Sequence, residues 1–141
     1  MNLLLDDHHL RSYLIDGKRS GPRRPPERLA TTGCWYFRLC SAVARPDVRG
    51  RLSGPIADLP DDLRSGVLAS LVTLPDHLEL RSLRELGWHA ADLGRRHGLN
   101  LLASEALAAA IDLDAAIAIA PRHRSDALRT AARHEGVRLV D

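Results

Sequence analysis

Short apolar runs closed by polar residues mark the strands of this sequence. Residues 2–5 form such a run, and the acids Asp6 and Asp7 follow it directly. A run of this length with polar groups at its end is typical of a strand buried on both faces of a sheet. Residues 114–120 and 137–140 show the same pattern near the C-terminal end. We therefore expect three strands, one early and two late in the chain.

Amphipathic segments fill most of the remaining sequence and predict helices. The clearest follows Ser82, which has capping-box spacing to Glu85 and is matched at the other end by Gly98. Its apolar face is predicted to comprise Leu83, Leu86, Gly87, Ala90, Leu93 and Gly94. Helices are expected at 7–15, 34–44, 61–72, 83–97, 101–112 and 126–135. Residues 74–80 suggest a short extended piece, and the Gly- and Pro-rich stretches 16–28 and 47–60 suggest exposed connections.

The order of these elements predicts an α/β fold. Strands separated by helices favour a parallel sheet with right-handed crossovers, and 141 residues fit one domain spanning 1–141. In such sheets the ligand site lies beyond the carboxyl ends of the strands. Asp6 and Asp7 fall at that place.

Composition narrows the function classes only slightly. The net charge is +2, so any electrostatic argument depends on local patches. Nineteen of the twenty cations are Arg, which suits phosphate contact but also follows from genome base composition. No export signal and no 18-residue apolar run is visible, so we expect a cytoplasmic protein without a membrane span. Cys34 and Cys40 are placed on different faces of one predicted helix, so no disulfide is expected.

Two stretches of the sequence resemble the PIN domain, the fold of VapC-type toxin ribonucleases. LLLDDHHL is similar to the opening strand of that family, with Asp6 at the position of the first acid. The second stretch, from ADLGRRHG to the final VRLV, resembles the C-terminal half of the family. The resemblance covers about the first ten and the last sixty residues. It implies a three-layer fold in which helices flank a short central parallel sheet.

The resemblance also implies a metal site. PIN nucleases hold Mg²⁺ or Mn²⁺ with three or four carboxylates, and the ion activates water and neutralises phosphate charge. Asp6 and Glu105 match two of those positions and are the predicted catalytic and metal-binding residues. The other two positions fall at 36–38 and at Pro121, where no acid stands. Asp7 is not expected to substitute, because successive residues at a strand end point in different directions. Metal binding is therefore expected to be weak.

Each candidate has a structural alternative. Asp6 could cap the following helix, and Glu105 could be a favourable partner of its own helix dipole. His8 or His9 could contact phosphate or transfer a proton. The histidines later in the chain lie in no zinc-binding motif, so no zinc site is predicted. Core packing is expected for the aromatic run 35–37, with a partner groove as the alternative.

Arginine-rich segments supply the predicted nucleic-acid contacts. They are Lys18, Arg19, Arg23, Arg24 and Arg28 in one loop, and Arg122 and Arg124 in the turn where the last acid is missing. We expect the loop to lie at the same sheet edge as Asp6, where it would hold an RNA backbone. A solvated loop without a role is the alternative.

Two functions follow as expectations. The first is a divergent PIN-like protein that binds or cleaves RNA, acting as a metal-dependent endoribonuclease if it is active. The second is a non-catalytic PIN-like module that binds a protein partner, such as an antitoxin, or regulates. A homodimer is a further expectation from the resemblance.

Overall fold

The computed structural model describes residues 1–17, 25–45 and 59–141. The strands in this part of the chain are β1 (Asn2–Leu5), β2 (Leu29–Thr32), β3 (Leu78–Arg81), β4 (Ala115–Ala118) and β5 (Leu139–Val140). The helices are α1 (Asp7–Leu14), α2 (Gly33–Ala44), α5 (Asp61–Leu71), α6 (Leu83–His97), α7 (Leu101–Leu113) and α8 (Asp126–His134). A single 3₁₀ turn, η1 (Pro121–His123), follows β4.

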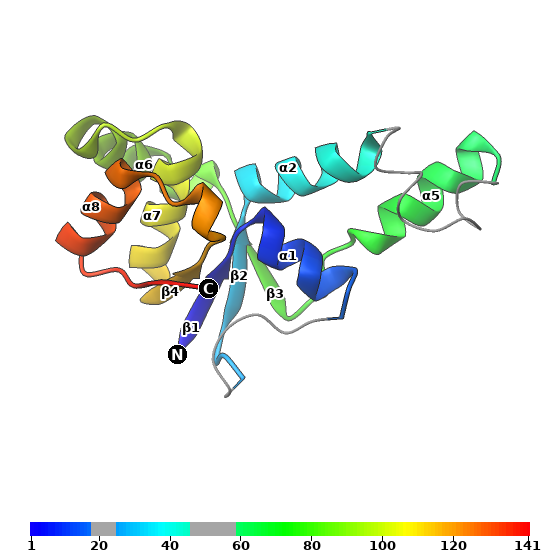
Figure 1. Cartoon of the computed structure of the whole chain (residues 1–141), viewed down its shortest axis with the longest axis horizontal. Coiled ribbons are helices and arrows are strands. Elements are labelled where there is room, and N and C mark those ends of the chain that lie inside the picture. Colours follow the sequence, from blue (N-terminus) through cyan, green and yellow to red (C-terminus); the bar gives the residue numbers. More distant parts are fainter. Residues whose placement is uncertain (18–24, 46–58) are drawn as a thin grey trace.

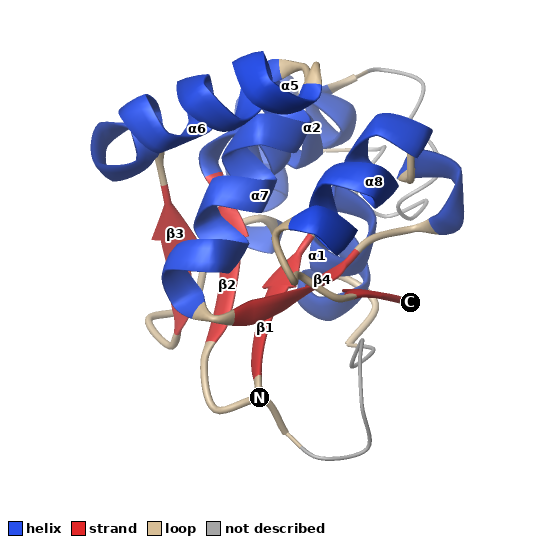
Figure 2. Cartoon of the chain, turned by 90° about the vertical axis from the view of Figure 1, so that its left-hand side faces the viewer, coloured by secondary structure: helices blue, strands red, loops and turns tan. Residues whose placement is uncertain are grey.

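The strands form one five-stranded sheet in the order β3-β2-β1-β4-β5, and every neighbouring pair is parallel. Strand β1 therefore lies at the centre, with β2 and β4 on its two sides (Figure 2). This arrangement confirms the prediction of an α/β fold with a short parallel sheet flanked by helices.

Helices cover both faces of the sheet (Figure 1). One apolar core joins Leu4 of β1 to α6, α7 and α8, while the other joins Leu3 and Leu5 to α1, α2 and α5. Successive strand residues point to opposite faces, so β1 supplies side chains to both cores. These two cores explain why β1 is apolar throughout and could be recognised in the sequence.

Most helices begin and end where the sequence predicted. Ser82 and Glu85 form the expected capping box of α6, and Gly98 ends that helix in the left-handed conformation at φ 63°. Thr32, Asn100 and Ser125 cap α2, α7 and α8 through their side-chain oxygens. On the predicted face of α6, Leu86, Ala90 and Leu93 are buried, whereas Leu83 is 39% exposed.

Strand β2 was missed by the sequence analysis. Its four residues, LATT, follow a Pro-rich stretch and include two Thr, so they do not form the apolar run by which β1 and β4 were recognised. The extended piece expected at 74–80 lies slightly later, as β3. The predicted connections 16–28 and 47–60 lie mostly outside the described residues, because the structure does not describe 18–24 and 46–58.

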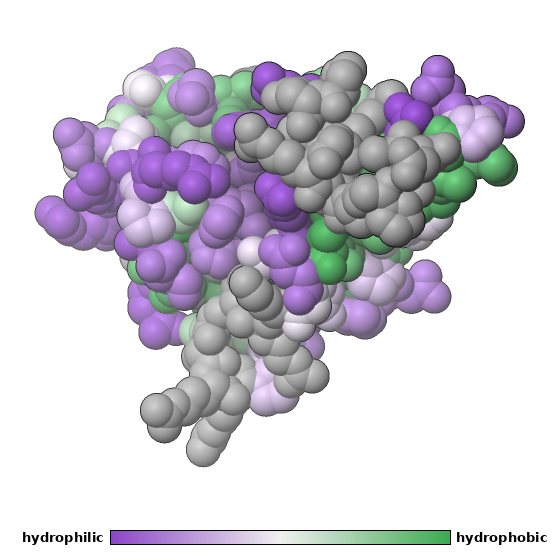
Figure 3. Space-filling model, turned by 45° about the vertical axis from the view of Figure 1, so that its right-hand side comes forward, coloured by the Kyte–Doolittle hydropathy of each residue, from purple (hydrophilic) through white to green (hydrophobic). Residues whose placement is uncertain are grey.

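The surface in Figure 3 is divided by polarity. Hydrophilic side chains cover most of its left-hand part, and hydrophobic ones gather at the right-hand end, near α5. Helix α5 buries only Leu68, and its Leu63 is exposed. Across the described ranges, every helix is too short or too polar to cross a membrane.

Candidate functional site

Asp6 occupies the predicted place at the carboxyl end of β1, where it is fully buried. Its extended backbone makes it the N-cap of α1, and its Oδ1 accepts bonds from the His9 amide at 2.8 Å and from His9 Nδ1 at 2.7 Å. Oδ2 accepts from the Ala120 amide at 2.9 Å and lies 3.3 Å from His123 Nδ1. The side chain therefore joins three parts of the chain.

Hydrogen bonding keeps this carboxylate ionised. Burial opposes the charged form, but the bonds from the His9 ring and from the His9 and Ala120 amides outweigh it and lower the pKa of Asp6 to about 2. An ionised carboxylate can only accept hydrogen bonds, so His9 Nδ1 carries a proton and donates it to Asp6 Oδ1.

The His123 ring has a defined tautomer. Arg122 Nε donates to His123 Nε2 at 3.2 Å, so the proton of a neutral ring lies on Nδ1 and points at Asp6 Oδ2. The same Nδ1 is 3.7 Å from Asp7 Oδ1, a buried oxygen without a hydrogen-bond partner among the described residues. Asp7 thus faces the same histidine as Asp6, contrary to our expectation, because it is the first residue of a helix and not a continuation of the strand.

These contacts fit poorly with a PIN-type magnesium site. An ionised carboxylate offers about four lone-pair positions, and four nitrogen donors already surround those of Asp6. Magnesium prefers an octahedral shell of oxygens. Here the close group at the site contains Asp6, Asp7 and a histidine, and Glu105 is not a member of it.

Glu105 has a different task in the structure. It is 1% exposed on α7, and its Oε1 accepts the Cys34 amide at 2.8 Å, near the N-terminus of α2. The carboxylate therefore stabilises the start of α2, where a negative charge is favourable. Burial and the Glu105 charge raise the pKa of the Cys34 thiol to about 11. Of the structural alternatives to a metal ligand, a solvated Glu105 side chain is excluded by this burial, and the carboxylate contacts the start of α2.

The two positions without acids are Pro121 and the segment 36–38. Pro121 begins the η1 turn, and Trp35, which comes directly before 36–38, is buried in the same core as α7. Tyr36 donates its hydroxyl to the Val72 carbonyl at 3.0 Å. Phe37, by contrast, is 70% exposed, so the expectation of core packing is wrong for this aromatic residue.

The cationic residues predicted to contact nucleic acid lie in different parts of the structure. Arg122 is exposed beside His8, with 3.4 Å between Nη2 and His8 Nδ1. Arg124 holds the turn through bonds to the carbonyls of Ile119 and Val140, each at 2.9 Å. Arg28 pairs with Glu79 through two bonds of 2.7 and 2.8 Å. Lys18, Arg19, Arg23 and Arg24 lie outside the described residues.

Arg28 does not lie at the Asp6 edge. It comes just before β2, which runs parallel to β1, so it stands at the amino ends of the strands. Asp6 stands at the carboxyl ends, a strand length away. For Arg28, the prediction of a cationic loop beside Asp6 is therefore wrong.

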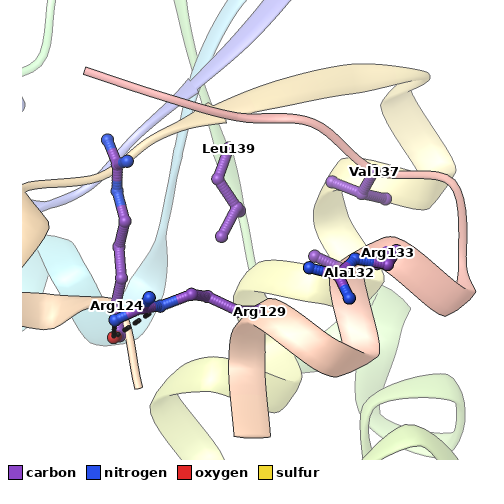
Figure 4. A pocket seen from close by; sticks show the side chains of 6 residues that line it. All are labelled: Arg124, Arg129, Ala132, Arg133, Val137 and Leu139. Atoms are coloured by element: carbon purple, nitrogen blue, oxygen red, sulfur yellow. Dashed lines mark hydrogen bonds between the residues drawn. The ribbon is translucent and has the colours of Figure 1, made fainter. Parts of the chain in front are cut away.

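A basic hollow lies between α8 and β5 and was not predicted. It has a volume of about 310 Å³, and its lining residues are Arg124, Arg129, Ala132, Arg133, Val137 and Leu139. Arg124 and Arg129 lie together on one side, with Leu139 above them (Figure 4). Arg129 and Arg133 are one helical turn apart, a spacing that could have revealed a cationic helix face.

Comparison with known families and curated proteins found no similar family or protein. No protein-family model matches the chain, and no curated protein matches it.

Proposed function

We propose that this chain is a PIN-like module that binds the backbone of RNA in the cytoplasm, without metal-dependent cleavage. The observation that carries the proposal is the enclosure of Asp6 by four nitrogen donors. The acid at the first metal position serves there as a structural acceptor. Exposed groups at the same edge include His8, Arg122 and Arg38, whose Nε lies 3.5 Å from Asp7 Oδ2.

The cationic surface supports phosphate as the ligand. The turn 121–125 presents Arg122 beside His8 and supplies Arg124 to the basic hollow, so the two features share one segment. Arg129 and Arg133 extend the positive charge along α8. Guanidinium groups bind phosphate oxygens through paired hydrogen bonds, which suits an RNA backbone.

Fluorescence anisotropy with a labelled single-stranded RNA tests the proposal. We expect affinity to fall as salt rises, and each of the variants Arg122→Ala and Arg129→Ala to lower the salt slope by about one ion. The exposed Arg84 on α6 gives the matched control, Arg84→Ala, which should bind as the parent does. Chelator should leave binding unchanged.

Two results would overturn the proposal. One is equal loss of RNA binding in the Arg84→Ala control and in the Arg122→Ala variant, which would mean that the effect is one of net charge. The other is RNA cleavage by the parent protein with Mn²⁺ that is lost with chelator and in Asp6→Asn. That result would restore the metal nuclease as the function.

A second candidate function is protein binding through the exposed apolar surface near Phe37. Phe37, Leu83 and Leu101 are 70%, 39% and 57% exposed. A hollow of about 400 Å³ lies between α2 and the starts of α6 and α7, with Phe37 and Leu83 in its wall. The partner would be a second copy of the chain or an antitoxin-like segment.

Sedimentation of the purified chain at rising concentration tests the first of these partners. A dimer through this surface should dissociate in Phe37→Ser, whereas Leu63→Ser, at an exposed leucine on α5, should leave it intact. Equal effects of the two substitutions would exclude this surface as the dimer contact.

A further inference from the structure

We propose that a divalent transition metal ion of the Zn²⁺ class binds between the ends of α6 and α8, held by His97, His134 and Glu135. The three residues come from two helices and lie outside the Asp6 site. No sequence motif contains them, because His97 is separated from the other two by all of α7 and β4.

The geometry brings three ligand atoms to one place. His97 Nε2 lies 2.8 Å from Glu135 Oε1, and His134 Nδ1 lies 3.4 Å from the same oxygen. One ligand atom from each of the three residues lies within 4.8 Å of those of the other two. Two ligand atoms on one tetrahedral zinc ion are about 3.3 Å apart, given metal–ligand distances near 2.0–2.1 Å. Small side-chain rotations are therefore enough to close the site.

The ligand types select the metal. Two imidazoles and one carboxylate suit zinc and its neighbours, whereas magnesium prefers an all-oxygen shell. His97 is the last residue of α6 and His134 the last of α8, so the negative ends of two helix dipoles face the position of the cation. A fourth coordination position remains for water.

Arg96 is the competing cation at this position. Its Nη1 donates to Glu135 Oε1 at 3.0 Å. Its Nε also donates to Asp92 Oδ2 at 2.8 Å, so Arg96 keeps a charged partner if the metal takes Glu135.

The bound ion would fasten α8 to α6. Glu135 ends α8, and Gly136 follows in the left-handed conformation at φ 74°, leading toward β5. Metal binding would thus stabilise the contact between the ends of α6 and α8.

Calorimetric titration of the full chain with Zn²⁺ at pH 7.5 tests the site. We expect one ion per chain, with at least a tenfold loss of affinity in His134→Gln and in Glu135→Gln. His134 is 69% exposed, so its replacement should leave the fold intact. The control is His89→Gln, at a half-buried histidine on α6 outside the cluster, which should bind as the parent does.

A thermal melt gives a second readout. Zinc should raise the melting temperature of the parent and of His89→Gln but not that of His134→Gln, since only a folded site binds the ion. The proposal fails if the parent binds no zinc, or if His134→Gln binds as well as the parent. It also fails if His123→Gln abolishes binding, because the ion would then lie at Asp6 and Asp7.

Discussion

Asp6 shows how one side chain can hold distant segments together. Its carboxylate caps α1 through His9 and accepts the backbone amide of Ala120, 114 residues away. A buried acid with this many donors is stabilising only while it is ionised. The acid–base behaviour of Asp6 is therefore a measurable part of the stability of the fold.

Acid should weaken the fold through Asp6. The pKa is 3.8 without these contacts and about 2 in the folded chain. Because the folded value is the lower one, the stabilisation is complete above pH 4 and is lost as pH falls from about 4 to about 2. The contribution of the ionised Asp6 to the free energy of unfolding amounts to roughly 2 kcal/mol. Urea unfolding of the parent and of Asp6→Asn at pH 6 and pH 2.5 should show a difference between the two proteins that shrinks in acid.

The exposed Asp76 provides the control for that measurement, since Asp76→Asn should follow the parent at both pH values. A gap between the parent and Asp6→Asn that stays constant from pH 6 to pH 2.5 would contradict the role of the ionised carboxylate.

Removal of the Glu105 charge should make Cys34 more reactive. The thiol pKa is about 11, because burial and the neighbouring carboxylate both disfavour the thiolate. In Glu105→Gln the second cause disappears, so the pKa falls and alkylation by iodoacetamide at pH 8 becomes several-fold faster. Mass spectrometry can follow Cys34 with Cys40 as the internal reference. An unchanged ratio of the two rates would show that burial alone protects Cys34.

Prediction from sequence succeeded at residues whose role is local. The place of Asp6 followed from an apolar run that ends in a polar residue, and the helix caps followed from short spacings. The burial of Glu105 and its bond to Cys34 depend on how α7 packs on α2, which no local pattern encodes. The cluster of His97 and Glu135 was missed for the same reason.

Among the elements, α6 and α7 make a particularly close approach. A Cβ atom at Gly94 would lie 2.7 Å from the Ser104 hydroxyl oxygen, whereas one at Gly87 would meet nothing within 4 Å. The Ser104 hydroxyl donates to the Asn100 carbonyl at 2.7 Å, so it cannot move aside without giving up that bond. The two glycines of one helix therefore have different tolerances.

The same substitution at these two sites should have different effects. Gly87→Ala should stabilise the protein by about 0.5–1 kcal/mol, since alanine is the better helix former. Gly94→Ala should be less stable than Gly87→Ala by about 1–2 kcal/mol because of the crowding against Ser104. Chemical denaturation measures both. Addition of Ser104→Ala should recover part of the loss in Gly94→Ala, and no recovery would place the crowding elsewhere.

At the scale of elements, sequence prediction depended on how clear the local pattern was. Helix α6 was found at its observed bounds because several turns of periodic pattern and a cap at each end define it. Strands β1 and β4 were found because each is an apolar run. Strand β2 ends in two Thr and shows no such run, so its place in the sheet is defined by its pairing with β1 and β3.

For the whole molecule, the central position of β1 makes it the strand that is hardest to separate from the rest of the fold. Leu3 donates its amide to the Arg28 carbonyl, and Asp6 donates to the Ala118 carbonyl, so β1 is bonded on both sides. Both apolar cores include β1 side chains. Opening this strand requires the separation of both layers of helices.

Hydrogen exchange should reflect that arrangement. We expect the Leu3 and Asp6 amides to exchange only through global unfolding. The Leu78 amide also has a backbone partner, the Pro75 carbonyl, but it belongs to the edge strand β3 and should exchange faster. NMR measurement of the three amides in deuterated buffer tests this order. Equal protection of Leu3 and Leu78 would show that the sheet opens as one unit.

The central place of β1 has a consequence for synthesis on the ribosome. Strand β1 leaves the exit tunnel long before one of its two neighbours, β4, which is translated just before Ala120, the residue that lies 114 positions after Asp6. Until β4 and Ala120 emerge, the apolar strand has an open edge and Asp6 lacks its bond to Ala120. The sheet therefore cannot form in the order in which its strands are translated, and a chaperone that shields residues 2–5 would have the interval between the synthesis of β1 and that of β4 in which to act.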